Sequence, residues 1–194
     1  MIKAGITGGI GSGKTTICKI FSILGVPIYH ADERAKILLS QSPDIREQIK
    51  ETFGEEIYTD GTILNREKLA QIIFNDKGAL TKINSMIHPL VYADFFHWCK
   101  SQISHYVLLE AAIMFESGGY QKLDKTIMIN APEDLRITRV IERDNVSNEQ
   151  VLARMRNQWP EERKVPLADF IINNDGNSML IPVVLKIHKT LSEL

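Results

Sequence analysis

Cysteine is scarce in this chain, which has only two among 194 residues, Cys18 and Cys99. The two are far apart and show no spacing typical of zinc ligands, so neither a disulfide framework nor a cysteine metal site is predicted. Cys18 lies within an apolar helical pattern, which predicts a buried thiol. This cysteine usage is typical of a reduced, intracellular environment.

Long apolar runs are also missing. The longest, residues 106–115, is interrupted by Glu110 and is far shorter than the roughly 20 residues that span a bilayer. The first residues pass from a short apolar stretch directly into glycines, without the apolar segment and cleavage site of a signal peptide. We therefore expect a cytoplasmic protein without a membrane partner.

An excess of charge of either sign is absent, and the formal net charge is -1. Because general nucleic-acid-binding proteins carry a basic surplus, no nucleic-acid partner is expected. With 44% hydrophobic and 24% charged residues, the composition is that of a soluble globular protein. The length allows one substantial core with one or two small insertions. No feature requires an obligate protein partner.

The beginning of the chain predicts a βαβ unit. Residues 2–7 form a short, largely apolar run that stops at glycines, as a buried parallel strand does. Residues 15–24 carry apolar side chains at helical spacing, and Gly25 is a natural helix stop. Residues 26–29 then predict a second strand.

Helical patterns dominate from residue 33 to about residue 104, without a clear strand run. The expected helices include residues 45–53, 67–74 and 80–87. They are expected to end at Gly54, at Asp60 and Gly61, and at His88 and Pro89. The block is too long for a simple crossover, so it predicts a helical insertion that covers part of the sheet or forms a small subdomain.

Strand signals resume beyond this block. Three short β-rich runs each stop at polar or turn-forming residues, as strands with ligand-facing carboxyl ends do. They cover residues 106–109, 126–129 and 169–172. The sequence therefore predicts an α/β fold with a five-stranded parallel sheet flanked by helices.

The stretch GGIGSGKT matches Gly-x-x-x-x-Gly-Lys-Thr through Gly8, Gly13, Lys14 and Thr15. Backbone N–H groups that cradle phosphates require positive φ and a close approach that side chains obstruct. Lys14 is expected to reach the β- and γ-phosphates, and the Thr15 hydroxyl to join a Mg²⁺ shell. Because the loop follows an apolar strand and opens a helix, it predicts a site for ATP or GTP rather than a simple tight turn.

Three carboxylates are candidates for the chemistry beside this loop. Asp32 follows the second strand, where it could orient and deprotonate an attacking hydroxyl or cap the next helix; on position alone the two interpretations are equal. Glu110 ends a strand and fits either the water shell of a metal or a solvated strand end. Glu116 is the weakest of the three candidates.

Six of the nine arginines lie within residues 133–164. Arg136, Arg139 and Arg143 are spaced by three and four, which puts them on one face of a helix. A capping-box pattern at Ser147 predicts the start of a second helix. Any single arginine could belong to a salt-bridged surface. As a group beside the loop, they favour a lid that neutralises charge on a triphosphate.

The absence of an Asn-Lys-x-Asp element disfavours a GTPase, and the remaining features indicate a small-molecule kinase. Further characteristic segments, in order along the chain, are ITGGIGSGKTT near the start, HAD at 30–32, FGEEI at 53–57, DGTILNREKL at 60–69, IF at 73–74, IHPLV at 87–91, FESG at 115–118, RVIERD at 139–144 and ADFIINN at 168–174. Through these segments the sequence resembles the dephospho-CoA kinase family over nearly its whole length.

The resemblance implies ATP-dependent phosphorylation of the ribose 3′-hydroxyl of dephospho-CoA, with Mg²⁺, to give coenzyme A. It also implies a P-loop kinase core formed by residues 1–32, 105–132 and 165–194. A helical, substrate-binding CoA domain would cover residues 33–104, and a helical lid residues 133–164.

The resemblance assigns roles to single residues as well. Those expected to act in catalysis are Lys14, Asp32 as the base, and the lid residues Arg139 and Arg143. The ATP site is matched by Gly8, Gly11, Ser12, Gly13, Lys14, Thr15 and Thr16, with Asn174 near the adenine. The candidates on the acceptor side are Thr7, Asp32, Arg66, His88 and Glu116.

Three positions depart from the family pattern. His30 stands where the family usually has an Asp, Ala112 replaces a usual Pro, and Glu110 stands near a common Asp. Two alternatives remain open. A nucleoside monophosphate or shikimate-type kinase would use another acceptor, and a nucleotide-binding regulator would show no acceptor-dependent turnover.

Overall fold

A computed structural model describes residues 1–60 and 62–194. The side chains of residues 66, 74, 75 and 77 also lie outside the description. The described residues divide into two compact units. The first contains residues 1–30 and 102–194, and the second contains residues 31–101.

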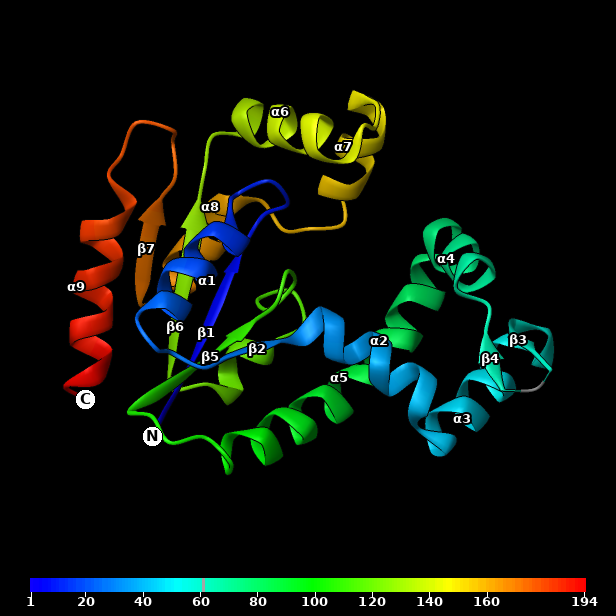
Figure 1. The fold of residues 1–194 in the computed structure, drawn as a ribbon. Coiled ribbons are helices and arrows are strands. Elements are labelled where there is room, and N and C mark those ends of the chain that lie inside the picture. Colours follow the sequence, from blue (N-terminus) through cyan, green and yellow to red (C-terminus); the bar gives the residue numbers. More distant parts are fainter. Residues whose placement is uncertain (61) are drawn as a thin grey trace. The chain divides into compact units, whose positions relative to one another are not determined.

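The first unit is built on a five-stranded parallel sheet with the strand order β2-β5-β1-β6-β7 (Figure 1). Its strands are β1 (Ile2–Gly8), β2 (Ile28–His30), β5 (Tyr106–Glu110), β6 (Lys125–Asn130) and β7 (Phe170–Asn173). The predicted α/β fold with five parallel strands is thereby confirmed. Since all strands run in one direction, their carboxyl ends meet at a single edge of the sheet.

Both faces of this sheet are covered. Helices α1 (Lys14–Ile23) and α9 (Leu180–Ser192) contribute to one buried core with alternate strand residues, because successive side chains of a strand point to opposite faces. The segment between β5 and β6, which includes the 3₁₀ helix η2 (Gly119–Lys122), packs beside Gly5 of β1. A Cβ at Gly5 would collide with the ends of the Met114 and Leu123 side chains, so glycine lets this segment pack closely against β1.

A pair of helices follows β6, as predicted for residues 133–164. The helices of this region are α6 (Glu133–Asp144), α7 (Asn148–Met155) and α8 (Glu161–Lys164), and the 3₁₀ helix η3 (Val165–Leu167) follows directly. The predicted capping box is confirmed at Ser147, whose Oγ accepts from the Gln150 N–H while Gln150 Oε1 accepts from the Ser147 N–H. Two orphan donors at the start of α7 are thus satisfied.

The second unit is mainly helical. It contains α2 (Ala31–Gln41), α3 (Pro43–Phe53), the 3₁₀ helix η1 (Glu55–Ile57), α4 (Arg66–Asn75) and α5 (Lys77–Cys99). Sequence analysis missed a small antiparallel ribbon formed by β3 (Tyr58–Thr59) and β4 (Ile63–Leu64). Strands of two residues are too short to leave a periodic signal in the sequence.

Helix α5 corrects one expectation. A helix end was expected at His88 and Pro89, but α5 continues through Pro89 to Cys99. A proline inside a helix removes one backbone hydrogen bond and costs about 3 kcal/mol. Buried side chains on both sides of the proline, such as Ile87 and Phe95, anchor the helix. Because each such burial contributes roughly 1.5–3 kcal/mol, packing outweighs the cost of the proline.

Both cysteines are free and buried, as predicted for Cys18. Burial, and next the Glu110 carboxylate, raise the pKa of the Cys18 thiol to about 12. At about pH 8 we therefore expect the native protein to react far more slowly with a thiol reagent than the unfolded protein, because the thiolate is the nucleophile. Thiol titration before and after unfolding in guanidinium checks this. Complete labelling of the native protein within minutes would contradict it.

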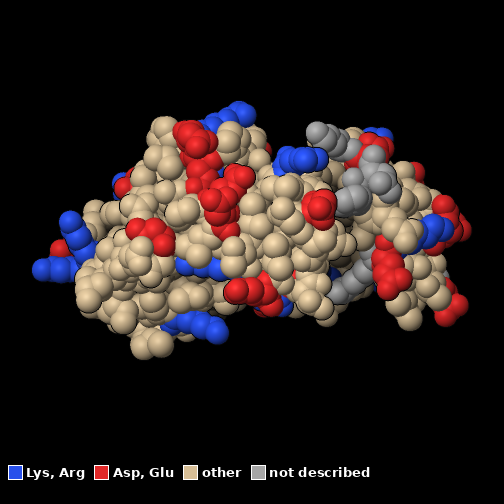
Figure 2. Space-filling model, turned by 90° about the horizontal axis from the view of Figure 1, so that it is seen from above, with Lys and Arg blue, Asp and Glu red and all other residues tan. Residues whose placement is uncertain are grey.

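Charged side chains of both signs are spread over the face that Figure 2 shows, and the basic residues described there form no continuous surface. This distribution agrees with the net charge of -1. In the described parts of the chain, no helix has the length and apolar character needed to cross a membrane.

Candidate active site

The carboxyl end of β1 runs into the glycine-rich loop, which turns tightly before α1. Gly11 and Gly13 have φ of 79° and 94°, a left-handed conformation that favours glycine. A Cβ at Gly13 would collide with the side chain of Asn174, and one at Gly11 with the backbone of Arg136. The glycines are thus required both by the turn and by the close packing around it.

The polar side chains of the loop follow this turn. Lys14 Nζ donates to the Gly8 carbonyl at 2.8 Å, so the lysine folds back along the loop. Ser12 is fully buried, and its Oγ has no hydrogen-bond partner among the described residues. Thr15 and Thr16 are exposed in the first turn of α1. The N–H groups of a first turn have no partner within their helix, which makes this end of α1 suited to an anion.

Asn174 and Arg139 approach the loop from β7 and α6. Asn174 is buried; its Nδ2 donates to the Ser12 carbonyl at 2.8 Å, and its Oδ1 accepts from Arg139 Nη2 at 3.3 Å. Arg139 Nη1 also donates to the Asn174 carbonyl at 3.2 Å and to that of Gly11 at 3.5 Å. The structure thus brings these residues together from three distant parts of the chain.

Asn174→Asp is expected to weaken ADP binding about tenfold, because a carboxylate cannot donate to the Ser12 carbonyl and leaves that buried acceptor without a partner. Asn173→Asp is a matched control, since Asn173 is exposed and uses its oxygen to accept from Asn130 Nδ2, which an aspartate retains. Calorimetric titration with ADP measures both. Equal affinities in the two variants would contradict a role of Asn174 in holding the loop.

The strands on one side of β1 bring His30 and Glu110 together. The two residues are register partners at the ends of β2 and β5, and His30 Nδ1 lies 3.3 Å from Glu110 Oε2. The Glu110 side chain is only 15% exposed, so it is not a solvated strand end. A mostly buried carboxylate therefore lies at the carboxyl edge of the sheet, on the strand next to β1.

Three of the predicted site residues belong to the second unit. Asp32 is exposed in the first turn of α2, which begins at Ala31, so it lies inside the helix rather than at the capping position. His88 is partly buried in the middle of α5. Arg66 is the first residue of α4, and its side chain lies outside the described residues. The roles of all three stay predictions.

Arginines of α6 and α7 share one carboxylate. Arg143 donates to Asp144 through Nε at 2.7 Å and Nη2 at 3.0 Å, and Arg154 Nη1 donates to the same side chain at 2.9 Å. These hydrogen bonds, chiefly from Arg143, lower the pKa of Asp144 to about 2. Because exposed ion pairs contribute little stability, an anion of higher charge can compete for both arginines. The action of Arg143 on a nucleotide stays a prediction.

A cluster of alternating charges is buried close to the loop. Arg136 Nη1 lies 3.4 Å from Glu161 Oε1, and Lys164 Nζ lies 3.7 Å from Glu116 Oε1. Burial raises the pKa of Glu161 and lowers the pKa of Lys164, while their partners act in the opposite direction. Glu116 also accepts a hydrogen bond from the Trp159 N–H at 2.9 Å. Its expected role in binding the acceptor substrate stays a prediction.

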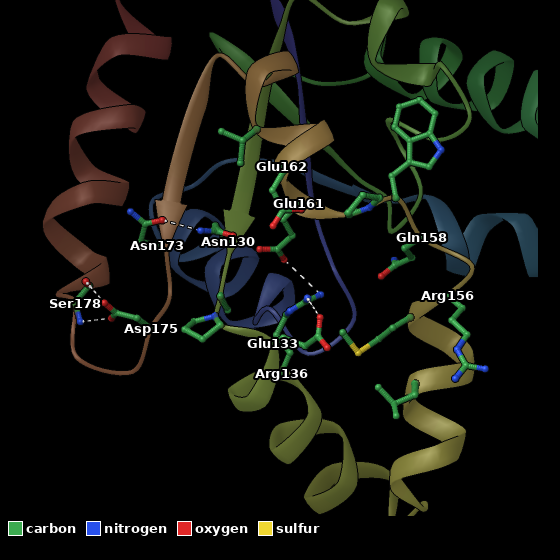
Figure 3. Close-up of a pocket in the computed structure, with 17 residues that line it drawn as sticks. Asn130, Glu133, Arg136, Arg156, Gln158, Glu161, Glu162, Asn173, Asp175 and Ser178 are labelled. Carbon is green, nitrogen blue, oxygen red and sulfur yellow. Dashed lines mark hydrogen bonds and ion pairs between the residues drawn. The ribbon is translucent and has the colours of Figure 1, made fainter.

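A hollow of about 1010 Å³ lies beside this cluster, among the carboxyl ends of β6 and β7 and the helices that follow them (Figure 3). Figure 3 shows Arg136 between Glu133 and Glu161, with which it forms ion pairs. Other lining residues are Asn130, Asn173 and Gln158. The wall of the hollow thus combines amides with charges of both signs.

Gln158 contacts the glycine-rich loop, and sequence analysis did not identify it. Its Oε1 accepts from the Ile10 N–H at 2.9 Å, and its Nε2 donates to the Ala112 carbonyl at 3.1 Å. No local pattern connects a glutamine in this charged stretch with the loop. Arg136, which packs against Gly11, stood out only as one member of the arginine group.

The residues at the loop fit a nucleoside triphosphate and Mg²⁺. A glycine-lined cradle that a Cβ would fill, a lysine along it and the unpartnered Ser12 hydroxyl are features of a phosphate site. In the described parts of the chain, no group of three or more His, Cys, Asp or Glu side chains could hold a metal alone. Magnesium at such sites is bound by few protein oxygens together with substrate phosphates. The Thr15 hydroxyl is suited to be one of these protein oxygens.

Comparisons with known proteins agree with this geometry. A sequence model of the dephospho-CoA kinase family matches residues 2–179. The dephospho-CoA kinase of Bacteroides fragilis is 38% identical over 187 residues, covering 96% of this chain and 91% of that protein. The crystal structure of TT1252 from Thermus thermophilus is 33% identical with a TM-score of 0.85, covering 100% of this chain and 97% of that one. The dephospho-CoA kinase from Campylobacter jejuni is 28% identical with a TM-score of 0.68, covering 98% and 97%. The chain therefore belongs to the dephospho-CoA kinase family.

Proposed function

We propose that this protein transfers the γ-phosphoryl group of ATP to the ribose 3′-hydroxyl of dephospho-CoA, releasing coenzyme A and ADP. The observation that carries the proposal is the extent of the family match, residues 2–179, which includes the loop, the second unit and the arginine-bearing helices. A phosphate loop alone would match only the first few residues. The match therefore favours this acceptor over those of other P-loop kinases.

Phosphoryl transfer depends mainly on positioning and on neutralising charge. The loop amides and Lys14 hold the phosphates. Arg139 and Asn174 hold this loop through its Gly11 and Ser12 carbonyls, and Asn174 with its neighbours lies near the adenine. The Thr15 hydroxyl would hold Mg²⁺, which when bound would neutralise negative charge on the phosphates. The segment 133–164 acts as a lid that supplies Arg143.

The second unit binds the acceptor, with Arg66 and His88 as its candidate contacts. Asp32 takes the proton of the 3′-hydroxyl while that oxygen forms its bond to the γ-phosphorus and the bond to ADP breaks. Thr7, which is buried in β1, and Glu116 are further candidates on the acceptor side.

ADP release with Mg-ATP tests the proposal in four parallel reactions, containing dephospho-CoA, adenosine monophosphate, shikimate or no acceptor. We expect a large stimulation by dephospho-CoA alone, with coenzyme A identified as the product by mass spectrometry. Equal rates in all four reactions would overturn the proposal and favour a nucleotide-binding regulator.

A further inference from the structure

The phosphate loop is tied to two other parts of the first unit through the side chain of Gln158. The Ile10 N–H, in the middle of the glycine-rich stretch, donates to Gln158 Oε1, and Gln158 Nε2 donates to the carbonyl of Ala112. Ala112 lies just beyond β5, the strand that pairs with β1. One amide therefore links the loop with the segment that follows the neighbouring strand.

An amide side chain suits both bonds. The Ile10 N–H can only donate and the Ala112 carbonyl can only accept, whereas a glutamine side chain offers one acceptor and donors at once. A carboxylate would serve Ile10 alone, and an aliphatic side chain neither. The pair of contacts thus fixes which end of the Gln158 amide faces the loop.

Gln158 is itself held in place by its neighbours between α7 and α8 (Figure 3). The Trp159 N–H donates to Glu116, which also pairs with the buried Lys164. The Arg163 guanidinium lies 3.4 Å from the centre of the Trp159 ring, a cation–π contact. Because these contacts fix the backbone on the C-terminal side of Gln158, its amide is preorganised for the loop.

The same segment reaches the loop at a second point. Glu161 pairs with Arg136, and a Cβ at Gly9 would collide with the Arg136 guanidinium. Figure 3 shows the Arg136 and Glu161 side chains directed toward each other. Two consecutive loop residues, Gly9 and Ile10, are thus supported by residues 158–161, either directly or through Arg136.

We propose that Gln158 is a positioning residue that holds the phosphate loop in its binding conformation before the nucleotide arrives. It acts through the Ile10 amide and touches no phosphate itself. The proposal rests on the nucleotide site of the proposed function and deepens it. Without this amide, the loop would have to become ordered on binding, at a cost in affinity.

Gln158→Leu removes both bonds, and Gln158→Glu keeps an acceptor for Ile10. We expect Gln158→Leu to raise the KM for ATP and the dissociation constant of ADP about tenfold, with Gln158→Glu in between. An interaction made equally in the ground and transition states affects KM alone, so kcat and the KM for dephospho-CoA should stay within about twofold. Asn157→Leu, at an exposed neighbouring residue, is the matched control.

Hydrogen–deuterium exchange gives a direct readout at the loop. In Gln158→Leu, peptides covering residues 8–14 should exchange faster than in Asn157→Leu, while those of α9 stay unchanged. Loop exchange and ADP affinity equal to those of Asn157→Leu would overturn the proposal. So would a general loss of protection and of all kinetic constants together, because that indicates a purely structural role. Neither ADP affinity nor hydrogen–deuterium exchange requires an acceptor substrate. Both measurements therefore test the role of Gln158 even if dephospho-CoA is not the substrate.

Discussion

Lys14→Ala is expected to lower kcat/KM for ATP about a thousandfold, because it removes a preorganised cation that meets the transferred phosphoryl group. In the structure Lys14 Nζ donates to the Gly8 carbonyl at 2.8 Å, which keeps the lysine along the loop. A binding phosphate replaces a carbonyl partner with an anionic one, and such charge-assisted hydrogen bonds are the stronger kind. The loss should therefore affect both ATP binding and turnover.

Lys19→Ala is the matched control for this prediction. Lys19 lies on the same helix and is exposed, so the variant removes an equal charge without touching the loop. Steady-state kinetics with varied ATP, together with a melting curve for each variant, separates loss of function from loss of folding. A value for Lys14→Ala within about tenfold of the control would exclude Lys14 as the phosphate-binding cation.

The loop and the sheet could be predicted from the sequence because their signals are local. A buried strand, a glycine turn and an amphipathic helix follow one another within the first 23 residues, from Ile2–Gly8 to the end of Lys14–Ile23. The capping box from Ser147 to Gln150 spans four residues and was equally predictable. In each case the residues that interact are close in the sequence, so spacing alone reports the contact.

The surroundings of the loop were much less predictable, because they depend on contacts between distant residues. Gln158 reaches Ile10 across 148 positions, and no pattern of residue types marks that pair. Asn174 was predicted through the family resemblance, but its bond to the Ser12 carbonyl needed the fold. Resemblance can name a residue, whereas only the tertiary structure gives its partner.

Pro89 illustrates the opposite failure, in which a strong local signal is overridden. Proline disfavours a helix interior through its missing N–H and its ring. In α5 the apolar side chains before and after it are buried, and their packing fixes the helix direction. A rule based on one residue type does not include the packing free energy of these side chains, because that depends on the tertiary structure of the whole unit.

Asp32→Asn is expected to lower kcat for dephospho-CoA phosphorylation about a thousandfold and to leave ADP affinity within about threefold, because asparagine keeps the shape but accepts no proton. Asp32 lies in the first turn of α2, and a bidentate ion pair connects α2 to α5. Arg34 donates to Asp94 through Nε at 2.9 Å and Nη2 at 2.8 Å. The helix that carries Asp32 is thus anchored within its unit.

Glu33→Gln separates chemistry from helix stability. Glu33 is the next residue, is also exposed, and is acidic in the same first turn, so both carboxylates interact similarly with the helix dipole. If Asp32 only stabilises α2, the two variants should lose a similar, small amount of stability and keep their turnover. If Asp32 is the base, only Asp32→Asn should lose turnover at saturating substrates. Near-normal turnover in Asp32→Asn would remove the base assignment yet leave the proposed function standing, because that function rests on the match across both units and not on one carboxylate.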